Sequence, residues 1–320
     1  MEWQSRLDRS SGLPRKDIKI DIIIPTLNEE QTIGILIQSI PSFVLDVKVS
    51  ILIVDGGSID RTAEVCRDQN VQFMVQKGAG KGRALREAAE YSKADIIVFM
   101  DGDGTYSAAD LKLLLEPLLM NKSDMVVGSR TMGRREKGSI THFNFFGNIL
   151  FNKTINFAMK SSITDSLSGY RALYRKTFNE LVLFGDSFEI EVEMTVEALV
   201  KGYRLLEVPI TYGSRKGSTT KLEPMRDGLR IGQTLLFILL NVKPLKFFGI
   251  LFTAFFIAGM YPASQVLYEK VFFGDIIHVP SVVFSSLLFV TATVLLVMGI
   301  VAELLVRSRR RLEYLINRKS

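Results

Sequence analysis

The sequence is poor in the residues that build disulfides and zinc sites. It has one cysteine among 320 residues, Cys66, which excludes an intramolecular disulfide and is typical of a domain in a reducing compartment. Its two histidines, His142 and His278, are too few and too far apart for a zinc site. The segment from Met1 to Lys19 is polar and charged and lacks the apolar core of a secretory signal peptide.

Two long apolar stretches lie near the C-terminal end. Hydrophobic residues make up 47% of the chain and the mean hydropathy is +0.20, which is high for a soluble protein. Residues 247–268 carry no charge, and residues 280–306 carry only Glu303. Each stretch is long enough to cross about 30 Å of hydrocarbon, so we predict two transmembrane helices within residues 246–306. The alternative is a pair of buried core helices.

The positive charge favours a membrane partner over nucleic acid. The net charge is +6 and the pI is near 9.3, but much of this charge lies beside the apolar segments. No strand face interleaves aromatic and basic residues, so we expect no nucleic-acid partner. The connector from Glu269 to Val279 has one lysine, whereas residues 307–311 include four arginines. By the positive-inside rule, we expect an integral membrane protein whose termini and soluble domain are cytoplasmic.

Strand and helix patterns alternate along the first part of the chain. Apolar runs predict strands at residues 18–24, 49–54, 71–75, 96–100 and 124–127, and further strands after Arg171 and at 204–210. This alternation predicts an α/β fold with a doubly wound, mostly parallel sheet. We expect a polar tail at 1–17, the α/β domain at 18–223, an amphipathic interfacial helix at 224–245 and a basic tail at 307–320.

One strand end carries two carboxylates. The apolar run at 96–100 leads directly into Asp101-Gly102-Asp103-Gly104. In open α/β sheets, ligands bind beyond the carboxyl ends of the strands. An Asp-x-Asp pair there can hold Mg²⁺ or Mn²⁺, which prefer oxygen ligands and bridge to phosphates. The alternative is an ordinary polar turn, since Asp and Gly are turn residues.

A basic, glycine-containing loop at residues 77–83 precedes another helix. It does not match the phosphate-loop motif, because the spacing is wrong and Gly82 follows Lys81 where a hydroxyl is needed. We expect either a flexible loop that approaches a pyrophosphate at the helix N-terminus or a solvated turn.

The pattern changes between residues 132 and 160. The basic residues Arg134, Arg135 and Lys137 precede the aromatic helical stretch from Phe143 to Phe151. This stretch is either a core helix or a helix at the membrane surface beside a lipid-substrate groove. The basic cluster favours the second alternative.

The motifs, taken in order, resemble a known family. They are Pro25-Thr-Leu-Asn-Glu29, Val54-Asp55-Gly-Gly-Ser58-x-Asp60-x-Thr62, Gly80-Lys81-Gly82, Asp101-Gly-Asp103, Gly128-Ser-Arg130, Asp165-x-x-Ser168-Gly169-Tyr170-Arg171, Phe188-Glu-x-Glu191 and Arg215-x-Gly217-Ser218-x-x-Lys221. Residues 18–225 are similar to the family 2 glycosyltransferases with the GT-A fold. The later motifs are similar to the polyprenyl-phosphate hexosyltransferases, of which dolichyl-phosphate mannose synthase is the best-known type. The two C-terminal spans match the membrane-anchored branch of that family.

The resemblance implies a nucleotide-diphosphate sugar as donor. Glu29 and Asp55 would hold the ribose and the base, while Asp101 and Asp103 would hold a divalent cation, Mg²⁺ or Mn²⁺, that bridges the diphosphate. Arg215 and Lys221, on a loop able to close, would add positive charge. The implied donor contacts are Pro25, Leu27, Glu29, Ile53, Asp55, Lys81, Asp101, Gly102, Arg215 and Lys221.

The resemblance also implies polyprenyl or dolichyl phosphate as acceptor. Its second pKa is about 6, so it is an anion at neutral pH and a competent nucleophile without a strong base. The residues that would hold the acceptor phosphate are Arg130, Arg134, Ser168 and Arg171. The implied catalytic residues are Asp103, Arg130 and Asp165, of which Asp165 would orient the acceptor or accept a proton. Family members invert configuration, so a single displacement is expected, in the cell membrane or in the endoplasmic reticulum of a eukaryote.

Two positions depart from the family pattern. Gly56 stands where a second aspartate is frequent, which leaves base recognition with one carboxylate. Thr105 stands where a metal-binding glutamine is frequent, which leaves the third metal ligand unassigned.

Two other functions are alternatives. A processive polysaccharide synthase would carry a Gln-x-x-Arg-Trp motif, but the only tryptophan is Trp3, outside the domain. A catalytically silent membrane scaffold would be favoured by loss of Asp101 and Asp103, and both are present. A homo-oligomer is compatible with the family, whose members often associate.

Overall fold

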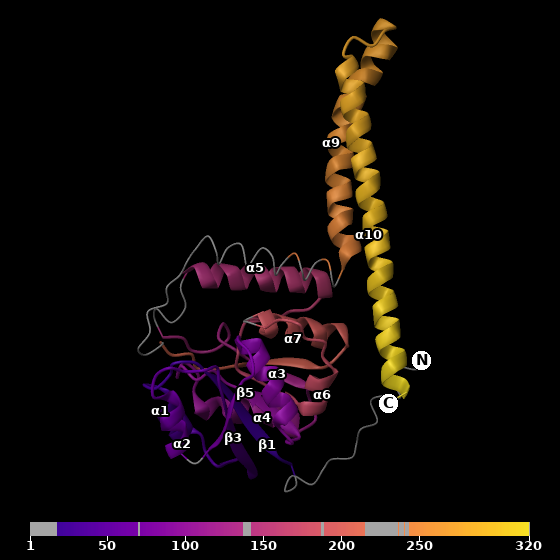
Figure 1. Ribbon diagram of the computed structural model, residues 1–320. Coiled ribbons are helices and arrows are strands. Elements are labelled where there is room, and N and C mark those ends of the chain that lie inside the picture. Colours follow the sequence, from indigo (N-terminus) through magenta and orange to yellow (C-terminus); the bar gives the residue numbers. More distant parts are fainter. Residues whose placement is uncertain are drawn as a thin grey trace. The chain divides into compact units, whose positions relative to one another are not determined.

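The computed structural model describes residues 18–69, 71–136, 142–186, 189–214, 236, 240 and 243–319. The chain divides into two compact units, residues 1–227 and residues 228–320. The first holds a sheet with helices α1 to α7, and the second holds two long helices (Figure 1). The predicted interfacial helix at 224–245 lies almost wholly outside the described residues, as does the tail at 1–17.

The first unit is built on one mixed sheet. Its strands are β1 (Ile20–Thr26), β2 (Phe43–Val44), β3 (Val47–Asp55), β4 (Gln72–Val75), β5 (Ile96–Phe99), β6 (Met125–Ser129), β7 (Arg171–Tyr174) and β8 (Leu205–Pro209). Their order is β2-β3-β1-β5-β7-β6-β8, with β4 also paired to β3. Strands β1, β3, β4 and β5 are parallel to one another, as are β6 and β8. The predicted mostly parallel α/β sheet is therefore confirmed.

Strand β7 runs against both of its neighbours, which the alternation of strands and helices did not predict. It pairs antiparallel with β5 on one side and with β6 on the other, so β5 and β6 point the same way. Arg171, its first residue, pairs with Phe99 of β5 and Val127 of β6. The carboxyl ends of β5 and β6 therefore meet the amino end of β7 at one edge of the sheet.

Helices cover both faces of the sheet because its central strands are apolar on both sides. Strands β5 and β6 are buried along their whole length. Helices α1 (Ile33–Ser39), α2 (Thr62–Asp68) and α4 (Leu111–Leu119) pack apolar residues on one face. Helices α3 (Lys81–Tyr91), α6 (Arg175–Glu180) and α7 (Glu189–Val200) cover the other. This is the predicted doubly wound arrangement.

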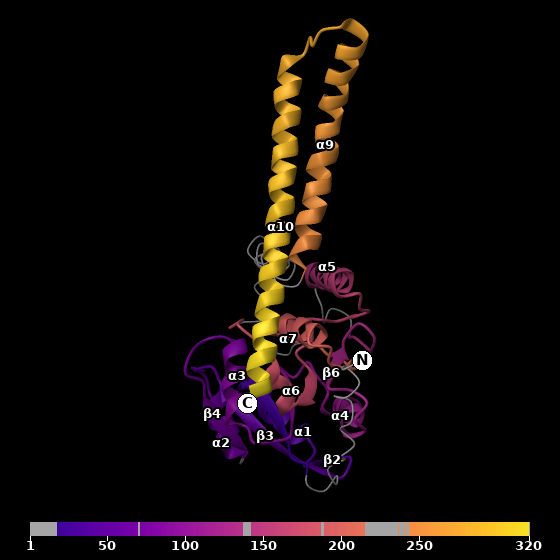
Figure 2. The ribbon, with the colours of Figure 1, turned by 90° about the vertical axis from the view of Figure 1, so that its right-hand side faces the viewer.

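Helix α5 (His142–Met159) packs beside α7 in the first unit (Figures 1 and 2). Its residues Phe151 and Ile155 are buried, as expected for a core helix. Its residues Ile149 and Phe157 are exposed, as expected for a helix that presents an apolar surface. The helix therefore combines features of both alternatives that the sequence left open.

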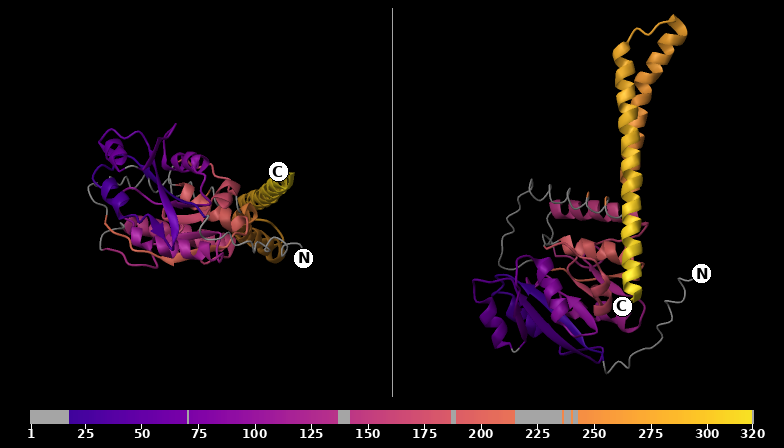
Figure 3. Two further views of the ribbon diagram at one scale, coloured as in Figure 1. Left: turned by 90° about the horizontal axis from the view of Figure 1, so that it is seen from below. Right: turned by 45° about the vertical axis from the view of Figure 1, so that its right-hand side comes forward.

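The second unit consists of α9 (Pro244–Phe273) and α10 (Val279–Lys319), which lie side by side and are joined at one end by a short connector (Figures 2 and 3). The segments Pro244–Phe273 and Val279–Arg309 are long and apolar enough to cross a membrane. Most of their large hydrophobic side chains are exposed, whereas those of a soluble core helix would be buried. The two predicted apolar spans lie within these helices.

Two glycines let the start of α3 pack against the segment that precedes α7. Gly82 donates its backbone N–H to the carbonyl oxygen of Asp186 at 3.0 Å. A Cβ on Gly82 would lie 2.2 Å from the carbonyl oxygen of Gly185, and one on Gly80 would lie 2.0 Å from that of Asp186. One side of the loop at 77–83 is therefore held by backbone packing, which neither sequence-based alternative included.

Gly82→Ala is expected to destabilise the protein by about 1–3 kcal/mol, because it inserts a methyl group into packed backbone. Alanine is otherwise the better helix former by about 1 kcal/mol, so a loss of stability isolates the clash. Thermal unfolding of the purified protein, followed by circular dichroism, measures it. Gly78→Ala is the matched control, since the three nearest atoms to a Cβ there all belong to the flexible Arg83 side chain. An equal or higher melting temperature for Gly82→Ala would contradict this packing.

Candidate active site

Three chain segments meet at the carboxyl edge of the sheet. Asp101 follows β5, Arg130 follows β6, and Gly169 precedes β7. A Cβ on Gly169 would lie 2.9 Å from Oδ2 of Asp101, and the Gly169 N–H donates to the Tyr106 hydroxyl oxygen at 2.9 Å. The antiparallel direction of β7 thus brings the loop at 165–169 to the strand ends that carry the predicted acidic and basic residues.

Lys81 is half-buried between two carboxylates. Its ammonium contacts Asp101 and lies 2.7 Å from Oε1 of Glu191 on α7. Burial alone would lower the pKa of Lys81, but the carboxylates of Asp101 and Glu191 raise it above its usual value. The ammonium therefore stays charged and places fixed positive charge beside Asp101.

Glu191 is a site residue that sequence reasoning missed. Its side chain is 3% exposed, and Oε2 has no hydrogen-bond partner among the described residues. The available signal was the Phe188-Glu-x-Glu191 motif, in which Glu191 points away from the helix face shared by Glu189 and Glu193. Which of these faces meets Lys81 depends on how α7 packs.

Asp103 is held by a residue that departs from the family pattern. The Thr105 N–H and hydroxyl both donate to Oδ1 of Asp103, at 3.1 and 2.6 Å. Asp103 is 8% exposed, whereas the side chain of Asp101 is 28% exposed. Thr105 therefore orients the second carboxylate of the Asp-x-Asp pair.

The donor atoms at this position fit a hard divalent cation. Asp101 and Asp103 supply carboxylate oxygens, and the missing side chain at Gly169 lets Asp101 and Lys81 lie against the backbone, since a Cβ there would come within 2.9 Å of Oδ2 of Asp101 and of Nζ of Lys81. Over the described parts of the chain, no group of three or more His, Cys, Asp or Glu residues is placed to hold a metal ion. Two protein carboxylates completed by phosphate and water oxygens is the usual environment of Mg²⁺ with a phosphate substrate.

The residues predicted to hold the nucleotide lie at the ends of β1 and β3. Asp55 is buried, and its carboxylate accepts hydrogen bonds from the Gly57 N–H at 3.1 Å, the Ser58 N–H at 3.0 Å and the Ser58 hydroxyl at 2.6 Å. It therefore shapes the loop after β3. Glu29, in the loop after β1, donates its N–H to the Thr62 hydroxyl oxygen at 2.8 Å.

The other predicted contacts to the donor differ in exposure. Leu27 is 57% exposed and Pro25 is half-buried, so both offer surface to a ligand, while Gly102 is buried. Ile53 is fully buried inside β3, where its backbone is paired to both β1 and β4. The predicted nucleotide contact from Ile53 does not fit this position, because its side chain fills the core.

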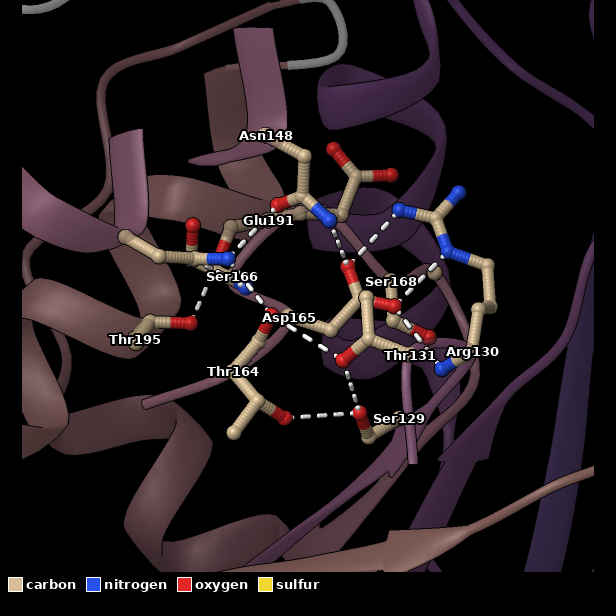
Figure 4. A network of polar contacts seen from close by, with 12 residues as sticks. Ser129, Arg130, Thr131, Asn148, Thr164, Asp165, Ser166, Ser168, Glu191 and Thr195 are labelled. Carbon is tan, nitrogen blue, oxygen red and sulfur yellow. Dashed lines mark hydrogen bonds and ion pairs between the residues drawn. The ribbon is translucent and has the colours of Figure 1, made fainter. Parts of the chain in front are cut away.

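Arg130 and Asp165 form a bidentate ion pair, in which Asp165 is fully buried and the Arg130 side chain is 14% exposed (Figure 4). The Nε and Nη2 groups of Arg130 donate to Oδ2 and Oδ1 of Asp165, both at 2.8 Å, and the Arg130 backbone N–H donates to Oδ2 at 2.9 Å. Asn148 donates to Oδ1 at 3.0 Å, so the fully buried Asp165 receives four hydrogen bonds. These donors occupy its lone pairs, which fits an orienting role and leaves no position for accepting a proton.

The environment of Arg130 keeps it charged. Burial would lower the pKa of Arg130, but the Asp165 carboxylate raises it well above its usual value. The guanidinium carbon also lies 5.4 Å from the centre of the Tyr212 ring. A guanidinium fixed in this way presents a permanent cation at the sheet edge.

Helix α5 holds the loop that carries Asp165. Asn148, Asn152 and Asn156 are spaced four residues apart and face this loop. Asn152 accepts a hydrogen bond from the Ser166 N–H at 2.9 Å, and Asn156 accepts one from the Ile163 N–H at 2.8 Å. Sequence reasoning missed this asparagine ladder, although a four-residue spacing on one helix face was available as a signal.

Glu207 on β8 holds the same loop from the other side. Its carboxylate accepts the N–H groups of Thr164 and Asp165, each at 2.8 Å. Burial raises the pKa of Glu207, although these two hydrogen bonds oppose the shift. The loop is therefore fixed between α5 and the sheet.

Arg171 lies inside the domain. It is fully buried and donates to the carbonyl oxygens of Ser166 and Ser168 and to the Thr195 hydroxyl of α7. Burial lowers the pKa of Arg171 to about 10. The predicted phosphate contact from Arg171 does not fit this position, because its guanidinium has no exposed surface.

The remaining residues predicted to contact the phosphate and the diphosphate differ in exposure, and two of them lie outside the described residues. Ser168 is fully buried, and its hydroxyl has no hydrogen-bond partner among the described residues. Arg134 is exposed and follows Arg130 by four residues in the sequence. Arg215 and Lys221 lie outside the described residues.

Known proteins share both the sequence and the fold. Glycosyltransferase AglJ of Haloferax volcanii is 36% identical over 291 residues, which cover 90% of this chain and 94% of that protein. Dolichyl-phosphate hexose transferase of the same organism is 31% identical over 222 residues, which cover 69% of this chain and 94% of that protein. Glucosyl-3-phosphoglycerate synthase from Mycobacterium tuberculosis, crystallised with Mn²⁺, uridine diphosphate and phosphoglyceric acid, superimposes with a TM-score of 0.57. It is 21% identical and covers 69% of this chain and 78% of its own, which shows a shared fold.

The family follows from these comparisons. The model of glycosyl transferase family 2 matches residues 21–182, which include nearly all of β1 to β7 and the residues Asp55, Lys81, Asp101, Asp103, Arg130 and Asp165. The predicted resemblance, the GT-A type of fold and the enzyme class of glycosyltransferase are thereby confirmed. The chain belongs to glycosyl transferase family 2.

Proposed function

We propose that this glycosyltransferase moves a hexose from a nucleoside-diphosphate sugar to polyprenyl or dolichyl phosphate, forming a lipid-linked sugar for glycosylation. Arg130 carries the proposal for the acceptor, because it is a fixed, half-buried guanidinium at the same sheet edge as Asp101 and Asp103. A guanidinium matches the oxygens of a phosphate in bidentate fashion. The two helices long enough to cross a membrane and the relative named dolichyl-phosphate hexose transferase support a lipid acceptor.

The donor diphosphate is proposed to bind at Asp101 and Asp103. A Mg²⁺ or Mn²⁺ ion held by these carboxylates would neutralise charge on the leaving diphosphate, and the Mn²⁺ in the structural neighbour supports this. The ammonium of Lys81 adds fixed positive charge beside Asp101. The loops shaped by Asp55 and Glu29 would receive the base and the ribose.

The reaction would be a single displacement that inverts configuration. A phosphate oxygen of the acceptor forms a bond to the anomeric carbon of the hexose while the bond from that carbon to the diphosphate breaks. The electron pair of the broken bond leaves with the nucleoside diphosphate. A phosphate monoester with a second pKa of about 6 is already an anion at neutral pH, so no proton acceptor is needed. This agrees with an Asp165 whose oxygens are engaged by four hydrogen bonds.

The catalytic domain and both termini are proposed to face the cytoplasm. The connector between α9 and α10 has one lysine, whereas four arginines lie within residues 307–311. Basic residues collect on the cytoplasmic side of membrane helices.

The direct test incubates membranes with a panel of radiolabelled nucleoside-diphosphate sugars and polyprenyl phosphate. At least one donor is expected to label the lipid phosphate when Mg²⁺ or Mn²⁺ is added.

Asp103→Asn is expected to abolish this transfer, because the amide keeps the shape of the side chain and removes an anionic ligand. Asp46→Asn, an exposed residue outside the site, is the control. Transfer by Asp103→Asn within about twofold of wild type would contradict the metal assignment, and no labelled lipid with any donor would contradict the acceptor.

Arg130→Ala is expected to weaken acceptor use more than donor binding. Loss of a charge-assisted bidentate contact should raise the KM for polyprenyl phosphate about ten- to a hundredfold. Arg130→Lys should restore little, since lysine lacks the planar fork. Arg204→Ala, which breaks the more exposed ion pair with Asp124, is the control. A raised KM for the nucleotide sugar with an unchanged KM for the lipid would move Arg130 to the donor site.

Cysteine labelling tests the topology. In a Cys66→Ser background, Asp275→Cys in the connector is expected to react with an impermeant maleimide on intact cells. Arg309→Cys is expected to react only after the cells are permeabilised. The reverse pattern would overturn the cytoplasmic placement of the catalytic domain.

A further inference from the structure

We infer that Asn148 is a positioning residue for the acceptor arginine and acts through Asp165. The inference deepens the proposed function and rests on it, because it concerns how Arg130 is presented to a lipid phosphate. It follows from a chain of hydrogen bonds that runs from α5 to Asp165 and on to Arg130 (Figure 4).

The amide of Asn148 has one orientation that satisfies both of its neighbours. Its Nδ2 donates to Oδ1 of Asp165 at 3.0 Å, and its Oδ1 accepts from Nδ2 of Asn152 at 3.0 Å. Turning the amide over would set its oxygen against the carboxylate and its NH₂ against another NH₂. Asn152 is fixed in turn, because its own oxygen accepts from the Ser166 N–H at 2.9 Å. Helix α5 therefore dictates that a donor faces Asp165.

Asn148 and Arg130 share one oxygen of Asp165. Oδ1 receives Nη2 of Arg130 at 2.8 Å beside Nδ2 of Asn148. Asn148 and Asp165 are both buried, so a lost donor is not readily replaced.

Loss of the Asn148 donor would change both the orientation of the Arg130 guanidinium and the strength of its ion pair with Asp165. With one hydrogen bond fewer, the Asp165 carboxylate would form a stronger ion pair with Arg130. An incoming phosphate would then compete less well with Asp165 for the guanidinium. The carboxylate would also be less restrained in rotation, and the planar guanidinium paired with it would follow. Small displacements of a positioning group reduce productive binding. Asn148 thus serves the acceptor without touching it.

The test is a double-mutant cycle of Asn148→Ala and Arg130→Ala in the full-length, detergent-solubilised enzyme. With Arg130 present, Asn148→Ala is expected to raise the KM for polyprenyl phosphate about tenfold, as for loss of a hydrogen bond to a charged group. The KM for the nucleoside-diphosphate sugar is expected to stay within about twofold. In the Arg130→Ala background, Asn148→Ala is expected to leave the acceptor KM unchanged.

Two further variants sharpen the test. Asn148→Leu keeps about the size of the side chain but removes the donor to Asp165, so it should raise the acceptor KM as alanine does. It takes the place of Asn148→Ala in the cycle if circular dichroism shows that the alanine variant does not fold. Lys153→Ala, exposed on the same helix, is expected to leave both KM values unchanged.

The outcomes separate this inference from the proposed function. If Asn148→Ala raised the KM for polyprenyl phosphate by the same factor with and without Arg130, the positioning role would be overturned. The acceptor assignment of Arg130 would remain intact. A uniform change of kcat and of both KM values would show a general structural role and would also contradict the inference. An unchanged acceptor KM in Arg130→Ala alone would overturn the proposed acceptor site itself.

Discussion

The burial of the Asp165 carboxylate is the constraint on which the proposed acceptor half of the site depends. A carboxylate removed from water is costly unless it is paired and fully hydrogen-bonded. Here the donors come from Arg130 after β6 and from Asn148 on α5, while Glu207 on β8 holds the backbone of the same loop. Satisfying one carboxylate therefore fixes β6, α5 and the loop before β7 relative to one another, and Glu207 ties β8 to the same loop.

The proposed donor half of the site carries an excess of carboxylates over cations. Lys81 is shared by Asp101 and Glu191, so two carboxylates face one ammonium, and Asp103 follows Asp101 closely in the sequence. This excess of negative charge favours a cation, whereas the guanidinium of Arg130 favours an anion. One sheet edge thus offers two chemically different places side by side, which is what the proposed transfer between two phosphate-bearing substrates requires. The direction of β7 makes this possible, because its amino end closes the edge between β5 and β6.

Much of the fold could be predicted because it depends on local patterns. The apolar run before Asp101 and the regular return of strand and helix signals reflect burial of each strand on both faces, and the structure has these elements close to the predicted bounds. The antiparallel β7 could not be predicted in this way, since strand direction depends on pairing partners that are distant in the sequence. Its position explains why Arg171, which reads as a basic residue of a binding motif, lies fully buried.

The sequence by itself determined the α/β class, the Asp101 and Asp103 pair at a strand end, and two helices long enough to cross a membrane. Each of these follows from the order and spacing of neighbouring residues. Only the tertiary structure decided that Glu191 meets Lys81, that Asn148 meets Asp165, and that Ile53 fills the core instead of facing a ligand. The physical reason is that a buried polar group must find its partners in space, and folding chooses those partners from segments far apart along the chain.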